Sequence, residues 1–401
     1  MPHIAIVGAG QAAASLAAKL RTLGYEGEVT IFGEEPVPPY QRPPLSKKYL
    51  LGEMDEDRLY LRPESFYADH GIALRLGTPV TAIEPQSKRL TVGAETVAWD
   101  QLALVTGSVP RRLPTAIGGA LGGVHTVRTL ADIDALRDAF RPGARVLVVG
   151  GGYIGLEAAA VAAQKGLRVT LVEAAPRILQ RVACPETSAW FAELHRSHGV
   201  DLREGTGLAR LTGEGRVTGA ELADGSRVDA DFVIVGVGIT PAIALAEAAG
   251  IACDNGIAAD AQGRTSAHGV WAAGDCASFP WQGGRLRLES VQNAIDMAET
   301  VAGNMLGAGQ PYRPLPWFWS DQYDVALQIA GLNTGYDRIV IRDAGAARSH
   351  WYYRGADFLA VDAMNDARAY MVGKRLLEAG RSPAPEAVAD PATDLKALLK
   401  G

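Results

Sequence analysis

The sequence predicts an α/β fold with two parallel-sheet units, one inserted into the other, followed by a C-terminal α+β domain. Three observations predict it. A strand, a glycine turn and a helix occur twice, near residues 3–22 and 145–165; a buried-type strand returns near residue 270; and short alternating runs follow residue 316. A length of 401 residues, with 48% hydrophobic and 21% charged residues, is typical of a globular chain of two or three domains.

The first unit begins with an apolar run at residues 3–7 and a turn at Gly8 and Gly10. Leu16, Leu20 and Leu23 then recur at helical spacing, and a second strand is expected at residues 29–32. A strand, helix and strand in this order form a βαβ unit, which requires a parallel sheet.

The second unit repeats this design, with strands expected at residues 145–149 and 169–172 and an Ala-rich helix ending before Gly166. Between the units, residues 74–105 read as an antiparallel excursion whose last part, 102–105, rejoins the first sheet. A second excursion is expected at residues 219–235.

The strand expected at residues 269–275 resumes the first unit, so the second unit is an insertion. We therefore expect a discontinuous first domain (1–110 and 236–315), an inserted domain (111–235) and a C-terminal domain (316–401). In the last domain, strands are expected at 325–329, 338–342, 350–354 and 358–361, a helix at 366–378, and a loose Pro/Ala-rich segment at 381–391.

Charge and cysteine content exclude several classes of protein. The 39 basic and 45 acidic residues leave a net charge of −6, which offers no overall cationic field for nucleic acid or an anionic membrane. The apolar stretches at residues 4–20 and 232–246 lack the features of a signal peptide or a membrane span. Cys184, Cys253 and Cys276 are scattered, without metal-type spacing, so we expect a soluble, reduced, cytoplasmic protein without a metal site.

Both glycine turns match the Rossmann-type dinucleotide fingerprint, in which missing side chains let a pyrophosphate approach a helix N-terminus. The first has Gly8, Gly10 and Ala13, with Glu34 beyond the next strand; the second has Gly150, Gly152 and Gly155, with Glu173. One such motif can be a purely structural turn. Two in one chain favour two dinucleotides that meet, as a flavin enzyme reduced by a nicotinamide requires.

A carboxylate after the second strand repels the extra phosphate of NADP, so Glu173 favours NAD. Arg177 and Arg181 lie downstream and temper this preference, because an arginine there can pair with a phosphate.

Over nearly its whole length the chain resembles the FAD-dependent, NADH-linked ferredoxin reductases of bacterial oxygenase systems, which include putidaredoxin and rubredoxin reductases. The resemblance implies a glutathione-reductase-like fold, with the NAD domain inserted into the FAD domain. It rests on the two glycine turns and on the strings Arg42–Lys47, Thr106–Gly107, Gly150–Glu157, Thr265–Asp275, Glu289–Asn293 and Pro316–Tyr323. Gln292 and Ala242 depart from the usual pattern of the family.

The resemblance implies a role for each matching residue. On the FAD side, beside the pyrophosphate turn of Gly8, Gly10 and Ala13, these are Ala12, Val80 and Glu34 for the adenosine half, Asp275 for the ribityl chain, Lys47 and Arg128 along the cofactor, and Val291 at the isoalloxazine end. On the NADH side they are Gly150, Gly152, Ile154, Gly155 and Gly236 around the second turn, Glu157 with Lys47 beside the nicotinamide, and Glu173 and Arg181 at the adenosine half.

Several of these residues have simpler interpretations. Asp275 can cap a helix, Lys47 can be a surface lysine, and Glu157 can favour a helix N-terminus through the helix dipole. Trp317 and Phe318 are at least as well explained by core packing, so Trp319 alone is taken as functional.

No C-x4-C pair or single cysteine stands where related disulfide and peroxide reductases carry one; the chain has Gln41–Lys47 there. Electrons therefore leave the flavin for an external acceptor. The resemblance implies a [2Fe–2S] ferredoxin that supplies a haem monooxygenase or a ring-hydroxylating dioxygenase. Docking requires local positive charge, with candidates Arg285, Arg287, Arg313, Arg368 and Arg375.

Two alternatives remain at this point. An NADH:rubredoxin or nitrite-system reductase would share every motif. A flavoprotein of the apoptosis-inducing-factor type would use NADH to change its partners rather than to feed an electron-transfer chain. The protein is expected to be a monomer or a weak dimer.

Overall fold

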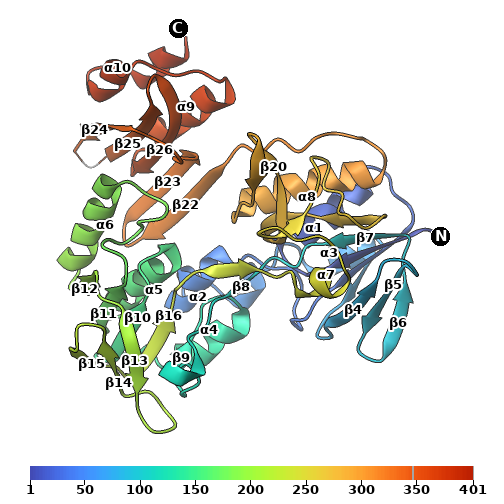
Figure 1. Cartoon of the computed structure of the whole chain (residues 1–401), viewed down its shortest axis with the longest axis horizontal. Coiled ribbons are helices and arrows are strands. Elements are labelled where there is room, and N and C mark those ends of the chain that lie inside the picture. The colour runs from blue at the N-terminus through green and yellow to red at the C-terminus, as the bar shows by residue number, and fades with distance from the viewer. Residues whose placement is uncertain (346, 401) are drawn as a thin grey trace. The chain divides into compact units, whose positions relative to one another are not determined.

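The computed structural model describes residues 1–345 and 347–400. The chain divides into two compact units (Figure 1). Unit 1 contains Met1–Gln41, Asp55–Val109 and Ile239–Pro314, and unit 2 contains Arg42–Met54, Pro110–Gly238 and the chain from Leu315 onward. The chain thus leaves and re-enters unit 1 twice, over Arg42–Met54 and over Pro110–Gly238.

Unit 1 is built on a five-stranded parallel sheet in the order β19-β7-β1-β2-β3. Its strands are β1 (His3–Val7), β2 (Glu28–Phe32), β3 (Ile72–Arg75), β7 (Gln101–Leu104) and β19 (Val270–Ala272). The pairing of β19 with β7 confirms that the chain returns to the first sheet after the insertion.

Helices α1 (Gln11–Thr22) and α8 (Val291–Met305) pack against each other, and unit 1 also contains α3 (Glu64–Asp69) and α7 (Ala244–Ala248). Leu16 and Leu20 of α1 are fully buried, as the helical spacing predicted. Leu23 is the C-cap that follows Thr22, the last residue of α1, and it is 47% exposed.

The predicted antiparallel excursion is confirmed as a sheet of β4 (Val80–Glu84), β5 (Arg89–Val92) and β6 (Glu95–Ala98). A second small sheet contains β18 (Ile257–Ala258), β20 (Ala277–Trp281) and β21 (Gly284–Leu286). Two further strands, β8 (Ser108–Pro110) and β17 (Ile239–Pro241), pair where the chain leaves and re-enters unit 1.

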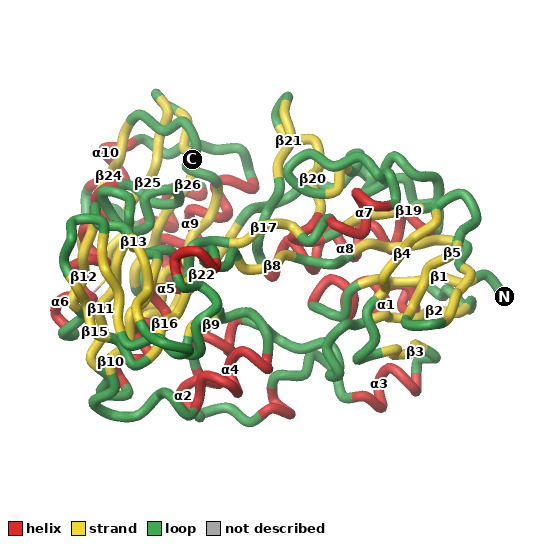
Figure 2. Tube along the Cα trace, turned by 60° about the horizontal axis from the view of Figure 1, so that its bottom comes forward, coloured by secondary structure: helices red, strands yellow, loops and turns green. Residues whose placement is uncertain are grey.

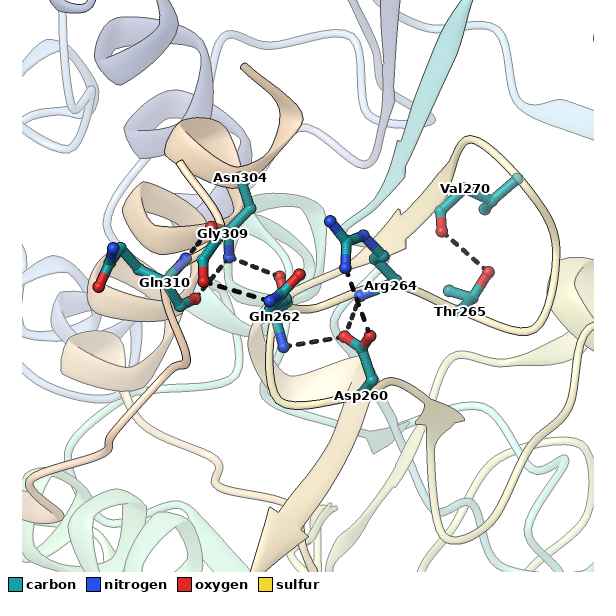
Figure 3. A network of polar contacts seen from close by, with 8 residues as sticks. All are labelled: Asp260, Gln262, Arg264, Thr265, Val270, Asn304, Gly309 and Gln310. Carbon is teal, nitrogen blue, oxygen red and sulfur yellow. Dashed lines mark hydrogen bonds and ion pairs between the residues drawn. The ribbon is translucent and has the colours of Figure 1, made fainter. Parts of the chain in front are cut away.

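A polar network fixes the loop that leads into β19 (Figure 3). The Asp260 carboxylate accepts hydrogen bonds from the backbone N–H groups of Gln262 (2.8 Å) and Arg264 (2.9 Å). The buried Asn304 amide donates to the carbonyls of Gln262 and Gln310, both at 2.8 Å. These bonds tie the loop to the end of α8, so β19 and the turn that follows it are held in place.

The inserted part of unit 2 has a five-stranded parallel sheet in the order β12-β11-β10-β16-β9. Figure 2 shows β10, β11 and β12 as neighbours. The sheet strands are β9 (Val124–His125), β10 (Arg145–Val149), β11 (Arg168–Glu173), β12 (Asp201–Glu204) and β16 (Phe232–Val235).

The helices of this part are α4 (Leu130–Arg137), α5 (Tyr153–Gln164) and α6 (Pro185–Ser197), while α2 (Lys48–Leu51) belongs to the separate segment Arg42–Met54 of unit 2. The second predicted excursion begins earlier than expected, as the antiparallel strands β13 (Leu208–Thr212), β14 (Gly219–Leu222) and β15 (Arg227–Asp229). The end of that predicted run is β16, which is a parallel core strand.

The C-terminal part of unit 2 is an antiparallel sheet in the order β22-β23-β26-β25-β24, covered by α9 (Ala367–Glu378). Its strands are β22 (Trp317–Gln322), β23 (Val325–Gly331), β24 (Arg338–Ala344), β25 (Ala347–Arg354) and β26 (Asp357–Met364). Four strands and the helix match the prediction. The aromatic run that forms β22 was not predicted as a strand.

The prediction of a loose segment at residues 381–391 was wrong. This stretch contains α10 (Pro385–Ala389), and Val388 is fully buried. The buried Arg342 guanidinium donates to four backbone carbonyls, those of Val388, Asp390, Pro391 and Thr393. A buried guanidinium needs such acceptors, so it fixes a segment whose composition alone predicts a loop.

Within the described ranges, no helix combines the length and apolar character needed to cross a membrane.

Candidate functional site

In the first glycine turn, a Cβ at Gly8 would lie 2.3 Å from the Val105 carbonyl oxygen, and Gly8 has φ +113°. Ala13, at the third position of the motif, is fully buried. Gly10, the N-cap of α1, differs, because a Cβ there would meet no atom within 4 Å. The protein's own packing therefore explains Gly8, whereas Gly10 leaves open space at a helix N-terminus.

In the second turn, too, packing explains the outer two glycines but not the middle one. A Cβ at Gly150 would lie 2.4 Å from the Gly236 carbonyl oxygen, and one at Gly155 would lie 2.1 Å from the Gly150 carbonyl oxygen. Gly152, the N-cap of α5, again has nothing within 4 Å. Each turn thus fits a pyrophosphate, which would lie where the middle glycine leaves the N–H groups of a helix start uncovered.

The two predicted carboxylates occupy different environments. Glu34 is exposed just after β2. Glu173, at the end of β11, is half-buried and accepts hydrogen bonds from the backbone N–H groups of Gly151 and Ala175, both at 2.7 Å. Glu173 is therefore fixed against the glycine turn, as a carboxylate that binds the ribose of a dinucleotide must be.

The arginines downstream of Glu173 also differ. Arg177 donates to the carbonyls of Ala183 and Gln180 and to the Ser188 hydroxyl, so its guanidinium is committed to the loop. Arg181 is exposed. Arg177 is therefore less available than Arg181 to pair with a coenzyme phosphate.

In unit 1, two of the residues predicted for FAD, Asp275 and Ala12, lie at the turn after β19. Asp275 is half-buried there, and its carboxylate accepts a hydrogen bond from Ser108 Oγ at 3.2 Å. A Cβ at the adjacent Gly274 would lie 3.3 Å from the Ala12 Cβ and 3.8 Å from Ala294 in α8, so this turn, α1 and α8 meet closely.

Two other predicted residues open elements of the same unit. Val291 is the first residue of α8, whose N-cap Ser290 accepts from the Asn293 N–H at 3.1 Å, and the buried Val80 begins β4. Sequence reasoning missed Ser108, which lies far from Asp275 along the chain and carries no motif of its own.

In unit 2, the structure brings Lys47 and Glu157 together. Lys47 Nζ lies 3.0 Å from Glu157 Oε1, and the two side chains are 15% and 5% exposed. Glu157 also accepts hydrogen bonds from Ser46 Oγ (2.6 Å) and Ser320 Oγ (2.7 Å). Burial raises the pKa of Glu157, whereas Lys47 and the two hydroxyls act in the opposite direction. Helix-dipole stabilisation alone does not explain a carboxylate held by three donors.

Sequence reasoning named Lys47 and Glu157 but not the two serines. Ser46 stands inside the Pro-Pro-Leu-Ser string that precedes Lys47, and Ser320 directly follows Trp319. Both strings were identified as family motifs, so the signal was present without a role attached to it.

Side chains alternate along β22, as in any strand. Trp319 is half-buried next to Trp317, with ring centroids 5.4 Å apart, and Trp317 also packs against Tyr370 of α9. Phe318 instead contacts Tyr153 at the start of α5, with centroids 4.7 Å apart. Trp317 and Phe318 are thus engaged in packing, as the sequence suggested.

Other predicted residues of unit 2 lie near helix starts. The Arg128 carbonyl accepts a hydrogen bond from Arg42 Nη1 (2.7 Å), and its N–H donates to Asp132 (3.0 Å). The capping box formed by Thr129 and Asp132 begins α4 directly after Arg128. Ile154 lies half-buried in the first turn of α5.

All three cysteines are free, and none lies in the Gln41–Lys47 string. In the part of the chain that the structure describes, there is no group of three or more potential metal ligands. Of the candidate docking arginines, Arg285 and Arg287 donate to backbone carbonyls of unit 1, whereas Arg313, Arg368 and Arg375 are exposed.

The profile of the pyridine nucleotide-disulphide oxidoreductase family matches residues 2–298, and that of the reductase C-terminal domain matches residues 317–399. A ferredoxin–NAD(P)(+) reductase of Sphingomonas sp. is 46% identical over 405 residues, covering 99% of this chain and 97% of that protein. The chain belongs to the ferredoxin reductases of this family. The predicted fold class and the stated resemblance are confirmed.

Two further relatives are named for different electron carriers. The reductase in a crystal structure of the covalent putidaredoxin reductase–putidaredoxin complex superimposes with a TM-score of 0.96 at 38% identity, covering 100% of this chain and 98% of that one. A rubredoxin–NAD(+) reductase of Ectopseudomonas oleovorans is 38% identical, but the match covers only 84% of this chain and 89% of that protein.

Proposed function

We propose that this chain is an NADH-dependent ferredoxin reductase that binds FAD through unit 1 and NADH through the second glycine turn. The proposal rests chiefly on Gly10 and Gly152. Each has open space where a Cβ would stand, so the packing of the protein itself does not require glycine at either position. When bound, FAD would accept two electrons together, as hydride, and could release them one at a time.

For FAD, we propose that Gly8, Gly10 and Ala13 shape the pyrophosphate site and that Ala12, Glu34 and Val80 contact the adenosine half. Asp275 would hold the ribityl hydroxyls, and its bond from Ser108 keeps the carboxylate oriented. Val291, Lys47 and Arg128 would contact the flavin end.

For NADH, the backbone around Gly150, Gly152, Ile154, Gly155 and Gly236 would receive the pyrophosphate. Glu173 would accept the ribose hydroxyls, since its position against Gly151 is already fixed, and Arg181 would contact the adenosine half. The commitment of Arg177 to the loop supports NADH over NADPH.

Lys47 and Glu157 would border the nicotinamide. The hydride step needs no general base, so their contribution is alignment and electrostatics, and a displacement of about 1 Å can cost on the order of a hundredfold in rate. A buried ion pair is costly to form, which favours a functional rather than a merely stabilising role.

Trp319 would lie on the route by which electrons leave the flavin. The acceptor proposed is a [2Fe–2S] ferredoxin that feeds a haem monooxygenase or a ring-hydroxylating dioxygenase, and the exposed Arg313, Arg368 and Arg375 would help to dock it. Three free cysteines agree with a reducing cytoplasm. We propose that the protein is a monomer or a weak dimer. We also propose an FAD domain at residues 1–110 and 236–315, an NAD domain at 111–235 and a C-terminal domain at 316–401.

Anaerobic stopped-flow mixing tests the proposal. NADH should bleach the flavin, and a plant-type ferredoxin should then reoxidise it faster than a rubredoxin does. Faster reaction with rubredoxin would favour the rubredoxin or nitrite-system alternative. A long-lived reduced flavin with feeble turnover on every acceptor would favour the apoptosis-inducing-factor type.

A further inference from the structure

A chain of hydrogen bonds runs through the buried interior of unit 2 and ends on Glu157. Ser320 Oγ donates to Glu157 (2.7 Å), and Gln322 Nε2 donates to Ser320 Oγ (3.2 Å). His195 Nε2 lies 2.8 Å from Gln322 Oε1, and the Tyr323 hydroxyl lies 3.1 Å from His195 Nδ1. Ser320, Gln322 and His195 are fully buried.

The chain joins elements far apart in sequence. Ser320 and Gln322 project from the face of β22 that also carries Phe318, Glu157 belongs to α5, and His195 is in the last turn of α6. The contact is therefore made by the C-terminal sheet with two helices of the inserted part.

The geometry assigns one direction to every bond. Gln322 turns its amide N–H group to Ser320, so its carbonyl oxygen faces His195, and an oxygen of this kind only accepts. His195 Nε2 therefore carries the proton. Burial lowers the pKa of His195 to about 4, so the ring is neutral and Nδ1 accepts from the Tyr323 hydroxyl.

Each donor thus points toward Glu157. Hydrogen bonds aligned in this way polarise one another, and the last of them reaches a carboxylate whose pKa burial raises. With reversed polarity, Ser320 would donate to Gln322, and Glu157 could bond to Ser320 only as the protonated acid. The tautomer of His195 consequently reports the ionisation of Glu157.

The far end of the chain is held by an unusual backbone. Tyr323 has φ +57°, in the turn of the β22–β23 hairpin, where glycine or asparagine is favoured and a bulky residue is rare. This turn places the Tyr323 ring on the His198 ring, with centroids 3.7 Å apart and planes within 14°. Burial raises the pKa of Tyr323, so its hydroxyl keeps the proton that it donates.

We propose that Gln322 and His195, neither of which touches Glu157, are positioning residues for the Lys47–Glu157 ion pair. Through Ser320 they keep the Glu157 carboxylate ionised and directed at Lys47. This inference rests on the proposed function only in taking the ion pair to border the nicotinamide. The ionisation of Glu157 can be measured in oxidised protein without NADH.

Glu157 faces Lys47. Tyr153 of the same helix is also titratable, and burial, Asp362 of β26 and Glu157, in that order, raise the pKa of its hydroxyl. At the other end, His198 acts to lower the pKa of His195.

The first experiment is 15N NMR of the oxidised holoenzyme labelled at histidine, at pH 7. We expect His195, assigned by its loss in His195→Phe, to be neutral with the proton on Nε2. A proton on Nδ1 would overturn the proposal, because Gln322 would then point the other way. This measurement needs no variant of Gln322 to fold.

The second experiment follows the infrared carbonyl stretch of a protonated carboxylic acid, assigned to Glu157 by its absence after Glu157→Gln. A hydrogen bond between neutral groups corresponds to roughly twofold to tenfold in an equilibrium constant. Gln322→Met removes the bond to Ser320 and His195→Phe the bond to Gln322, so each should raise the protonated fraction of Glu157 at pH 7 by roughly twofold to tenfold, with slower flavin reduction at that pH. His195→Gln, whose amide N–H can replace Nε2–H, should restore both.

The matched control is His350→Phe. His350 is a second fully buried histidine, its pKa is also lowered to about 4, and it bonds to Thr187 of α6 from the same C-terminal sheet. Among the described residues, His350 hydrogen-bonds to Thr187, Cys184 and Arg348, and to neither Glu157 nor Gln322. If His350→Phe protonates Glu157 as strongly as His195→Phe does, the effect is general loosening of α6 and the proposal fails. If wild-type flavin is not bleached by NADH, the proposed function fails instead, whatever the tautomer.

Discussion

Replacing Gly152 by alanine separates what the second glycine turn does for the fold from what it does for NADH. Gly152 has φ −82° and ψ 178°, an extended conformation that alanine adopts freely, and no atom lies within 4 Å of the added Cβ. The new methyl group would stand in the open space before the N-terminus of α5, where we place the pyrophosphate.

The expected magnitudes differ sharply for stability and for binding. Alanine lowers the entropy of the unfolded chain, which stabilises by about 0.4–1 kcal/mol, and is a poorer N-cap by a similar amount, so the free energy of unfolding should change by less than about 0.5 kcal/mol. The KM for NADH should rise at least about tenfold, which corresponds to about 1.4 kcal/mol of lost binding.

Gly155→Ala is the matched control within the same motif. Its Cβ would lie 2.1 Å from the Gly150 carbonyl oxygen, closer than real Cβ contacts, so the turn must shift. We expect a loss of stability of about 2 kcal/mol or more, because overpacking in a rigid core typically costs 1–3 kcal/mol.

Both variants are compared with wild type by thermal unfolding of the holoenzyme and by steady-state kinetics with NADH and a dye acceptor. A Gly152→Ala enzyme with an unchanged KM for NADH would refute the placement of the pyrophosphate. A Gly155→Ala enzyme as stable as wild type would refute the argument from packing.

Three further substitutions test separate parts of the site. Asp275→Ala should yield largely colourless protein, since the ribityl chain would lose its carboxylate; a fully yellow preparation, measured by the flavin-to-protein absorbance ratio, contradicts that role. Glu173→Ser should narrow the preference for NADH over NADPH, and an unchanged ratio of kcat/KM values removes the basis for it. Trp319→Ala should slow reduction of ferredoxin more than reduction of a dye, whereas equal slowing of both would count against its proposed role in electron exit.

Local patterns predicted the parallel units well because a βαβ segment is encoded within about 30 residues. The turns at Gly8 and Gly150 each follow a strand rich in β-branched residues, and the return strand at residues 270–272 is a short apolar run between Gly269 and Gly274. These signals do not depend on distant contacts, so they survive in the structure.

Contacts between distant residues could not be read in the same way. The bond from Ser108 to Asp275 spans 167 residues, and the bond from Ser320 to Glu157 spans 163. A buried serine has no pattern that distinguishes it from an exposed one until its partner is known. Likewise, the segment at residues 381–391 looked like a loop because nothing local indicates that Arg342 holds it.

We propose that NADH reduces a flavin that has no thiol partner and that electrons then leave singly for a ferredoxin. Anaerobic titration of the yellow holoenzyme with NADH, in the presence of excess oxidised ferredoxin, tests it directly. We predict two ferredoxins reduced for each NADH consumed. Yellow protein that NADH does not bleach, or bleached protein that leaves ferredoxin oxidised while reducing a dye, would contradict the claim.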